Sequence, residues 1–153
     1  MYLDAFWIDQ TEVTNAKYAL CVQDGICDLP KDTARYYDSN YANHPVVSVS
    51  WYDANTFCSY AQGRLQTEAE WEKAARGENA LLYPWGNNTP NNNLLNYNNV
   101  VGSTTEVGKY PNGDSPHGAL DMAGYHSIRV NDQWRLVFRW EVGVHDVSLT
   151  DYH

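Results

Sequence analysis

Thiols can act as nucleophiles, redox pairs or metal ligands, so the three cysteines of the 153-residue sequence are its first candidates for chemistry. Cys21 and Cys27 are too far apart for a Cys-x-x-Cys redox pair, and Cys58 provides no second pair that would complete a zinc site. Two interpretations stay open. We expect reduced, partly buried thiols in a cytoplasmic chain, and a local Cys21–Cys27 disulfide is the alternative if the parent protein is exported.

Oxygen ligands are concentrated in a run of about forty residues, 83–124, which is dominated by Asn, Gly and Pro and has no hydrophobic period. A structureless loop of that length needs something to organise it in a compact domain. Asparagine carbonyl oxygens suit a hard cation such as calcium. Turns in which Asn side chains bond to their own backbone are the alternative, and we favour them for the run as a whole.

The charge and hydropathy of the chain exclude several classes of partner. The formal net charge is −9, which argues against a general DNA or RNA binder, because phosphate contact needs clustered Lys and Arg. No apolar run approaches the roughly 20 residues needed to span a bilayer, so we expect no membrane partner. The N-terminus lacks the basic and apolar regions of a signal peptide, and the chain as written is therefore expected in the cytoplasm.

Helices and short strands must position these candidate residues. The sequence predicts three helices, each with an N-cap and a closing glycine: 15–24 with Thr14 and Gly25, 51–62 with Ser50 and Gly63, 68–76 with Thr67 and Gly77. Asp53 and Glu70 stand three residues after their caps and complete two capping boxes. Aromatic and β-branched residues predict short strands at 2–9 and 46–50.

The pattern changes after Gly124, where three short strands are expected at 125–130, 134–140 and 144–150. Side chains alternate in the middle strand. One face carries Trp134, Leu136, Phe138 and Trp140, and the other carries Arg135, Val137 and Arg139. A three-stranded sheet is only marginally stable alone, so the apolar face must find a partner.

Four segments of the first 124 residues form an ordered pattern: "FWIDQTEVTNAKY", "HPVVSVSWYDANTFCSYAQGRLQTEAEWEKAARG", "YPWGN" and "GALDMAG". Together they resemble the formylglycine-generating enzyme family, also called sulfatase-modifying factors. Gln66 is one departure, because that family usually has Pro before the Thr-Glu-Ala-Glu-Trp helix. The pattern also begins here without the family's earliest strand.

The resemblance implies a C-type-lectin-like fold with little regular secondary structure, and structural calcium held by loops. It places Asn96, the Tyr97 carbonyl, Asn99 and the Val101 carbonyl near one calcium site, although Asn99 stands where the family commonly has an acid. In the family, "DMAG" continues into Asn-Val-Trp-Glu-Trp, an Arg-Gly-Gly-Ser-Trp segment and the reactive cysteines that bind copper. The sequence after Cys58 has no cysteine, so we expect no copper and no oxidase activity.

A second resemblance covers 124–153, through "GYHSIRVNDQWRLVFRW" and the terminal "DVSLTDYH". These segments resemble the C-terminal part of RelE/HigB-type toxins, which are ribosome-dependent mRNA interferases. The resemblance implies that Arg129 and Arg135 contact RNA phosphates and that Arg135, Asp151, Tyr152 and His153 belong to the cleavage site. Such chemistry needs a base for the 2′-hydroxyl, a proton for the leaving oxygen and a cation for the phosphate charge. The toxin family's N-terminal helices and first strand are absent.

These observations predict an α+β chain with two incomplete parts that meet at Gly124. The first, 1–124, is a truncated C-type-lectin-like domain, and the second, 125–153, is an antiparallel β-meander. We interpret the whole as a non-catalytic sulfatase-modifying-factor-like module fused to a toxin remnant. An mRNA interferase of a toxin–antitoxin system is the first alternative, and a formylglycine-generating oxidase is the second. The tail would meet an antitoxin, the ribosome with its mRNA, or a second copy of the chain.

Overall fold

The structure is a computed structural model, and it describes residues 3–123. Regular structure in this part is sparse. The helices are α1 (Asn15–Gln23), η1 (Ser39–Tyr41), α2 (Trp51–Tyr60), α3 (Glu68–Arg76) and η2 (Pro111–Gly113), where η denotes a 3-10 helix. Irregular chain joins them, in agreement with the little regular secondary structure that the family resemblance implies. No helix in the described range is long and apolar enough to cross a membrane.

Local capping explains where the α-helices begin. The side chain of Thr14 accepts a hydrogen bond from the backbone N–H of Lys17 at the start of α1. Ser50 with Asp53 and Thr67 with Glu70 form complete capping boxes at the starts of α2 and α3. All three predicted N-caps are therefore confirmed, while α2 ends at Tyr60, two residues before its predicted end.

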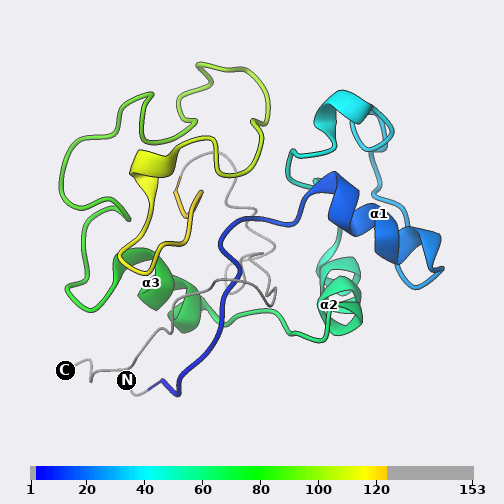
Figure 1. The fold of residues 1–153 in the computed structure, drawn as a ribbon, viewed down its shortest axis with the longest axis horizontal. Helices are drawn as coiled ribbons and strands as arrows, with labels where there is room; N and C mark the ends of the chain where they lie inside the picture. The colour runs from blue at the N-terminus through cyan, green and yellow to red at the C-terminus, as the bar shows by residue number, and fades with distance from the viewer. Residues whose placement is uncertain (1–2, 124–153) are drawn as a thin grey trace.

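A first hydrophobic cluster holds α1 and α2 together at one end of the molecule (Figure 1). Tyr18 of α1 stacks on Phe57 of α2, with ring centroids 5.5 Å apart. Tyr18 is buried, and its hydroxyl donates a hydrogen bond to the Asp28 carbonyl, so its polar end is satisfied. The other buried members of this cluster are Val13, Cys21, Cys27, Val46, Ala54, Cys58 and Leu65.

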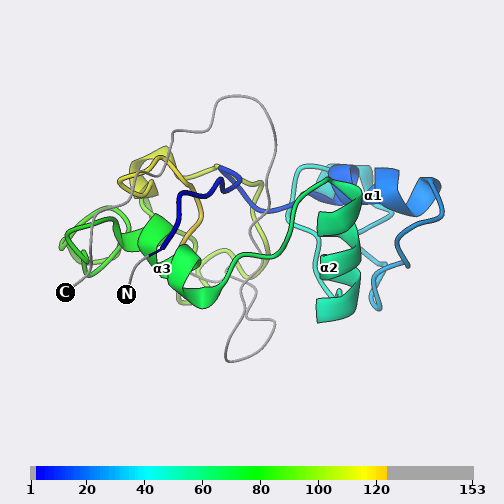
Figure 2. The ribbon, with the colours of Figure 1, turned by 90° about the horizontal axis from the view of Figure 1, so that it is seen from below.

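A second hydrophobic cluster lies around α3 at the other end, and two views separate it from α1 and α2 (Figures 1 and 2). Its buried members come from three distant parts of the chain: Phe6, Ile8, Ala74, Ala75, Ala119 and Met122. The first segment, residues 3–13, and the connection between α2 and α3 run between the two ends of the molecule (Figure 2). Residues 9–12 therefore connect Ile8 of the second cluster to Val13 of the first.

The strand predictions do not hold as stated. No β-strand longer than an isolated bridge forms within 3–123. Thr14 pairs there with Pro45 and Tyr83 with Gly86, and Phe6 of the predicted strand 2–9 also occupies a bridge position. The stretch 46–50 is interrupted by Ser48, whose φ is +61°. Val46 donates a backbone hydrogen bond to Val13, but no ladder continues from that bond. The second predicted part, the β-meander at 125–153, lies wholly outside the described residues.

Candidate functional site

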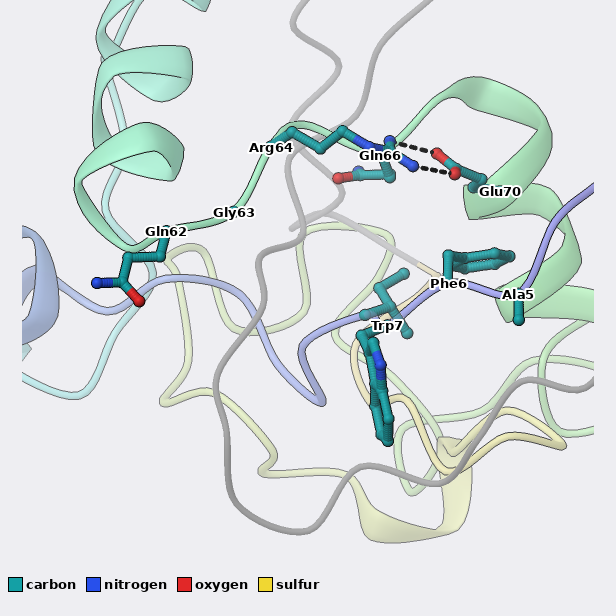
Figure 3. A pocket seen from close by; sticks show the side chains of 9 residues that line it. Ala5, Phe6, Trp7, Gln62, Gly63, Arg64, Gln66 and Glu70 are labelled. Atoms are coloured by element: carbon teal, nitrogen blue, oxygen red, sulfur yellow. Dashed lines mark hydrogen bonds and ion pairs between the residues drawn. The ribbon is translucent and has the colours of Figure 1, made fainter.

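A pocket of about 420 Å³ lies where the first segment passes the connection between α2 and α3. It is lined by Ala5, Phe6, Trp7, Ile8, Gln62, Gly63, Arg64, Gln66 and Glu70. Figure 3 shows the first segment on one side, and the connection with Glu70 of α3 on the other. The side chain of Trp7 points away from Arg64 and Glu70 and is 52% exposed. The pocket therefore combines aromatic surface with one strongly polar wall.

The polar wall is fixed by a bidentate ion pair between Arg64 and Glu70 (Figure 3). Arg64 donates from Nη1 to Oε2 at 2.8 Å and from Nη2 to Oε1 at 2.5 Å. The backbone N–H of Thr67 also donates to Glu70 Oε2, at 2.7 Å. Burial would raise the pKa of Glu70, but the hydrogen bonds from Arg64 and Thr67 outweigh it and lower that pKa. Glu70 is therefore a fixed carboxylate, unsuited to proton transfer near neutral pH.

The cysteines are arranged differently from the interpretation that we favoured. Cys21 and Cys27 form a disulfide, with Cα atoms 5.3 Å apart, so the expectation of three reduced thiols is wrong. A turn at Gly25, whose φ is +71°, brings Cys27 back toward the end of α1. Backbone N–H groups of Ile26 and Cys27 both donate to the Cys21 carbonyl and hold that turn.

Cys58 is the remaining thiol of the sequence, and it lies buried in α2 with 2% of its surface exposed. Burial raises the pKa of the Cys58 thiol, and the charge of Asp9 raises it further. A thiol with a raised pKa is a poor nucleophile and a poor metal ligand. The cysteines of this chain therefore do not fit a copper site, because two are bonded to each other and the third is an inert thiol.

The four residues assigned to calcium lie in one loop. Asn96 is buried and donates from Nδ2 to the Ser103 carbonyl at 2.9 Å. The Tyr97 carbonyl accepts from the Val100 N–H at 3.2 Å, while Asn99 has a φ of +56° and is exposed, as is Val101. The four ligand groups would be neutral oxygens. Among residues 3–123, no group of three or more His, Cys, Asp or Glu side chains could hold a metal ion.

Two histidines lie in loops within the described range. His44 is half-buried, and its Nδ1 is 2.9 Å from the Thr104 hydroxyl. Burial lowers the pKa of His44, and burial also lowers the pKa of His117, followed by the nearby charge of Lys73. The two side chains stand on separate loops. Arg129, Arg135, Asp151, Tyr152 and His153, which we assigned to RNA cleavage, all lie outside the described residues.

One polar pair was missed by the sequence analysis. Glu12 is 5% exposed, both of its carboxyl oxygens are buried, and the Asp121 carboxyl group lies within hydrogen-bonding reach of its side chain. Burial raises the pKa of Glu12 well above its usual value, and the charge of Asp121 raises it further. Asp121 accepts a hydrogen bond from the Gly108 N–H. A single Glu in a short extended segment gives no sequence signal of burial, because the burial comes from a loop about a hundred residues later.

Comparison with known proteins assigns the chain to a family. Residues 1–142 match the sulfatase-modifying factor enzyme 1-like domain, and the match runs past Gly124. The formylglycine-generating enzyme of Mus musculus is 37% identical over 117 residues, which cover 71% of this chain and 31% of that protein. "Serine/threonine-protein kinase pkn1" of Chlamydia pneumoniae is 34% identical over 143 residues, which cover 80% of this chain and 22% of that protein.

A third relative is named as inactive. "Inactive C-alpha-formylglycine-generating enzyme 2" of Bos taurus is 41% identical over 86 residues, which cover 55% of this chain and 24% of that protein. The chain thus spans less than a third of the length of each of these three relatives. Its match to the family domain nevertheless covers more than nine-tenths of its own residues. The chain belongs to the sulfatase-modifying factor enzyme 1-like family.

Proposed function

We propose that this chain acts as a non-catalytic, lectin-fold scaffold of the sulfatase-modifying factor type. The state of its cysteines is the observation that carries the proposal. Cys21 and Cys27 are consumed in a structural disulfide, and Cys58 is buried with a raised pKa. Oxidation of a substrate cysteine in the family depends on reactive thiols that bind copper, and this chain supplies none with that character.

The rest of the described part supports a structural role. Arg64 and Glu70 form an ion pair with each other at the pocket wall, and Arg64 also donates to the Leu65 carbonyl. Burial lowers the pKa of both His44 and His117. The family also contains a relative that is named inactive, so loss of catalysis within this fold has a precedent.

Peptide conversion tests the proposal directly. The purified full chain is incubated with copper, oxygen and a sulfatase peptide that contains Cys-x-Pro-x-Arg, and the peptide is followed by mass spectrometry. We expect its cysteine to stay intact, while an active formylglycine-generating enzyme converts the same peptide in a parallel reaction. Circular dichroism of the same preparation shows that the inactive chain is folded.

Enzyme-dependent conversion of the peptide cysteine would refute the scaffold proposal. A matched variant then identifies the thiol responsible. Cys58→Ser removes the single thiol outside the disulfide, and conversion that survives in this variant would come from Cys21 and Cys27 after reduction.

The tail supports a second candidate function, ribosome-dependent mRNA cleavage. Its motifs Arg-Val-Asn-Asp-Gln-Trp-Arg and Asp-Tyr-His favour it, with Arg129 and Arg135 on phosphates and Asp151, Tyr152 and His153 at the cleavage site. In this candidate the partners are the translating ribosome and an antitoxin that covers the tail. Induction of the intact gene would then arrest growth, and Arg135→Ala would relieve the arrest. Normal growth on induction, with the chain present, would refute this candidate.

A structural calcium ion is a further part of the proposal. The four oxygen ligands that the family resemblance assigns to it, from Asn96, Asn99 and the carbonyls of Tyr97 and Val101, belong to one loop of six residues. No carboxylate belongs to this set, so its affinity is expected to be low compared with charged calcium sites.

A further inference from the structure

Asn112 is the only asparagine of the sequence that is followed by glycine. The two residues belong to η2, the short 3-10 helix drawn in yellow in Figure 1. Gly113 is buried, and a Cβ atom at this position would collide with the Leu94 carbonyl oxygen. The packing therefore requires glycine here, because any other residue would push the backbone of Leu94 away.

An asparagine that precedes glycine is chemically labile. The backbone nitrogen of the glycine attacks the carbon of the side-chain amide, which closes a succinimide ring and releases ammonia. Glycine hinders this attack least, because it has no Cβ atom. Water then opens the ring at one of its two carbonyl groups. The product is aspartate or isoaspartate, and in isoaspartate the main chain continues through the side-chain carboxyl carbon.

The closed η2 helix keeps the two reacting groups apart. Asn112 is exposed, so water reaches its side chain, but the Gly113 N–H donates a hydrogen bond to the Tyr110 carbonyl at 2.9 Å. Ring closure requires rotation of the backbone between Asn112 and Gly113, and that rotation breaks the hydrogen bond. Pro111, at the start of η2, fixes a further backbone angle and favours the closed turn. The reaction is therefore slow as long as η2 stays closed.

We propose that Asn112 is a site of spontaneous deamidation that the fold protects, and that it converts mainly to isoaspartate when η2 opens. The conversion needs no enzyme and no further reagent, because it consumes one water molecule and releases one ammonia molecule. Asn112 does not line the pocket. The proposal therefore holds whether the chain is a scaffold or an enzyme.

The product does not fit the closed turn. Isoaspartate lengthens the backbone between 112 and 113 by one carbon–carbon bond, about 1.5 Å. Gly113 has no space for such a shift, since not even a Cβ atom fits beside Leu94. Leu95 and Asn96 follow Leu94 and are both buried, so a displaced Leu94 disturbs their packing. We expect a modified chain to stay open at η2, which makes the change irreversible.

The rate of deamidation in the folded and in the unfolded chain tests the protection. The full chain is kept at pH 8 in buffer and in concentrated guanidinium chloride, and peptide mapping with mass spectrometry follows each asparagine. We expect Asn112 to react at least about tenfold more slowly in buffer, because it reacts only while η2 is open. Asn92, which is exposed and is followed by Asn93, is the internal reference and should react slowly in both solutions. Equal rates for Asn112 in the two solutions would overturn the proposal.

A variant that loosens η2 tests the same point without denaturant. Pro111→Ala leaves the reacting residues unchanged and should speed the reaction in buffer by about two- to fivefold, with no change in guanidinium chloride. Pro90→Ala, in another loop, is the matched control and should leave both rates unchanged. A rate in buffer that Pro111→Ala does not alter would contradict protection by η2.

Refolding tests whether the product is excluded from the closed turn. Chains that carry isoaspartate at position 112 are separated by chromatography after incubation in denaturant and are returned to buffer. They should melt at a lower temperature than Asn112→Asp chains treated in the same way, which carry the same charge without the longer backbone. Equal melting temperatures would show that η2 closes over the product, and the proposed irreversibility would be wrong.

Discussion

Glu12 offers a test of how burial and a neighbouring charge act on one carboxyl group. The substitution Glu12→Gln keeps the shape of the side chain and removes its ability to ionise. In the folded protein the pKa of Glu12 is raised well above the ordinary value of 4.5 for a glutamate, first by burial and then by the charge of Asp121. An amide at this position can still donate a hydrogen bond to the Asp121 carboxylate, as a protonated carboxyl group would.

The sign and size of the effect follow from proton linkage. Because the folded-state pKa is raised, the contribution of Glu12 to stability is fully present below about pH 4.5, and it is lost as the pH rises toward the folded-state pKa. Each pKa unit corresponds to about 1.4 kcal/mol, so at pH 7 the loss cannot exceed about 3 kcal/mol. We therefore expect Glu12→Gln to raise the free energy of unfolding at pH 7 by up to about 3 kcal/mol.

Urea denaturation at pH 4 and pH 7 measures this difference. The variant and the wild type should be equally stable at pH 4 and should separate at pH 7. Glu106→Gln is the matched control, because Glu106 is exposed, and it should produce no gain of that size. A Glu12→Gln effect that is the same at both pH values, or a variant less stable than the wild type at pH 7, would refute the reasoning.

Three further predictions concern the disulfide, a helix cap and calcium. The double substitution Cys21→Ser with Cys27→Ser opens a short loop and should lower the free energy of unfolding, measured by urea denaturation, by about 2 kcal/mol. Reductant should lower the free energy of unfolding of the wild type by as much and should leave that of the variant unchanged. Thr67→Ala removes the hydroxyl that accepts from the Glu70 N–H at 3.2 Å and should lower the free energy of unfolding by about 1 kcal/mol. The control Ser59→Ala, on the exposed side of α2, should lower it far less. Equal losses would contradict the capping role. Millimolar calcium should raise the melting temperature by an amount that corresponds to about 1 kcal/mol or less, and Asn99→Ala should abolish the shift; identical melts with calcium and with chelator would exclude the site.

The helices could be predicted because their signals are local. Ser50 with Asp53 and Thr67 with Glu70 satisfy backbone groups within four residues of each other, so the capping boxes need no distant partner. Strands differ in this respect. The stretch 46–50 has β-branched residues, but a ladder requires a neighbour along its whole length, and the structure supplies a single bridge next to it.

The candidate site was harder to predict because it depends on distant parts of the chain. The pocket exists because Ala5–Ile8 pass beside residues some sixty positions later, and no spacing in the sequence announces that approach. The disulfide was misjudged for a related reason. The Cys21–Cys27 spacing permits both states, and the turn at Gly25 that brings the two side chains together is settled by backbone hydrogen bonds. Glu12 is buried by the loop that carries Asp121, which is again a non-local event.

The presence of two hydrophobic clusters has a consequence for the way this molecule comes apart. The cluster around α1 and α2 and the cluster around α3 share no buried residue, so each can open as a cooperative unit of its own. A protease that cuts the loop at 31–38 during such an opening would leave the α3 half intact for a time. The same division would matter in a gene fusion, because a segment joined next to the α3 half would disturb the cluster around α3 and leave the cluster around α1 and α2 intact. A domain with two separate clusters can gain or lose a fused segment at one end while the other end stays folded.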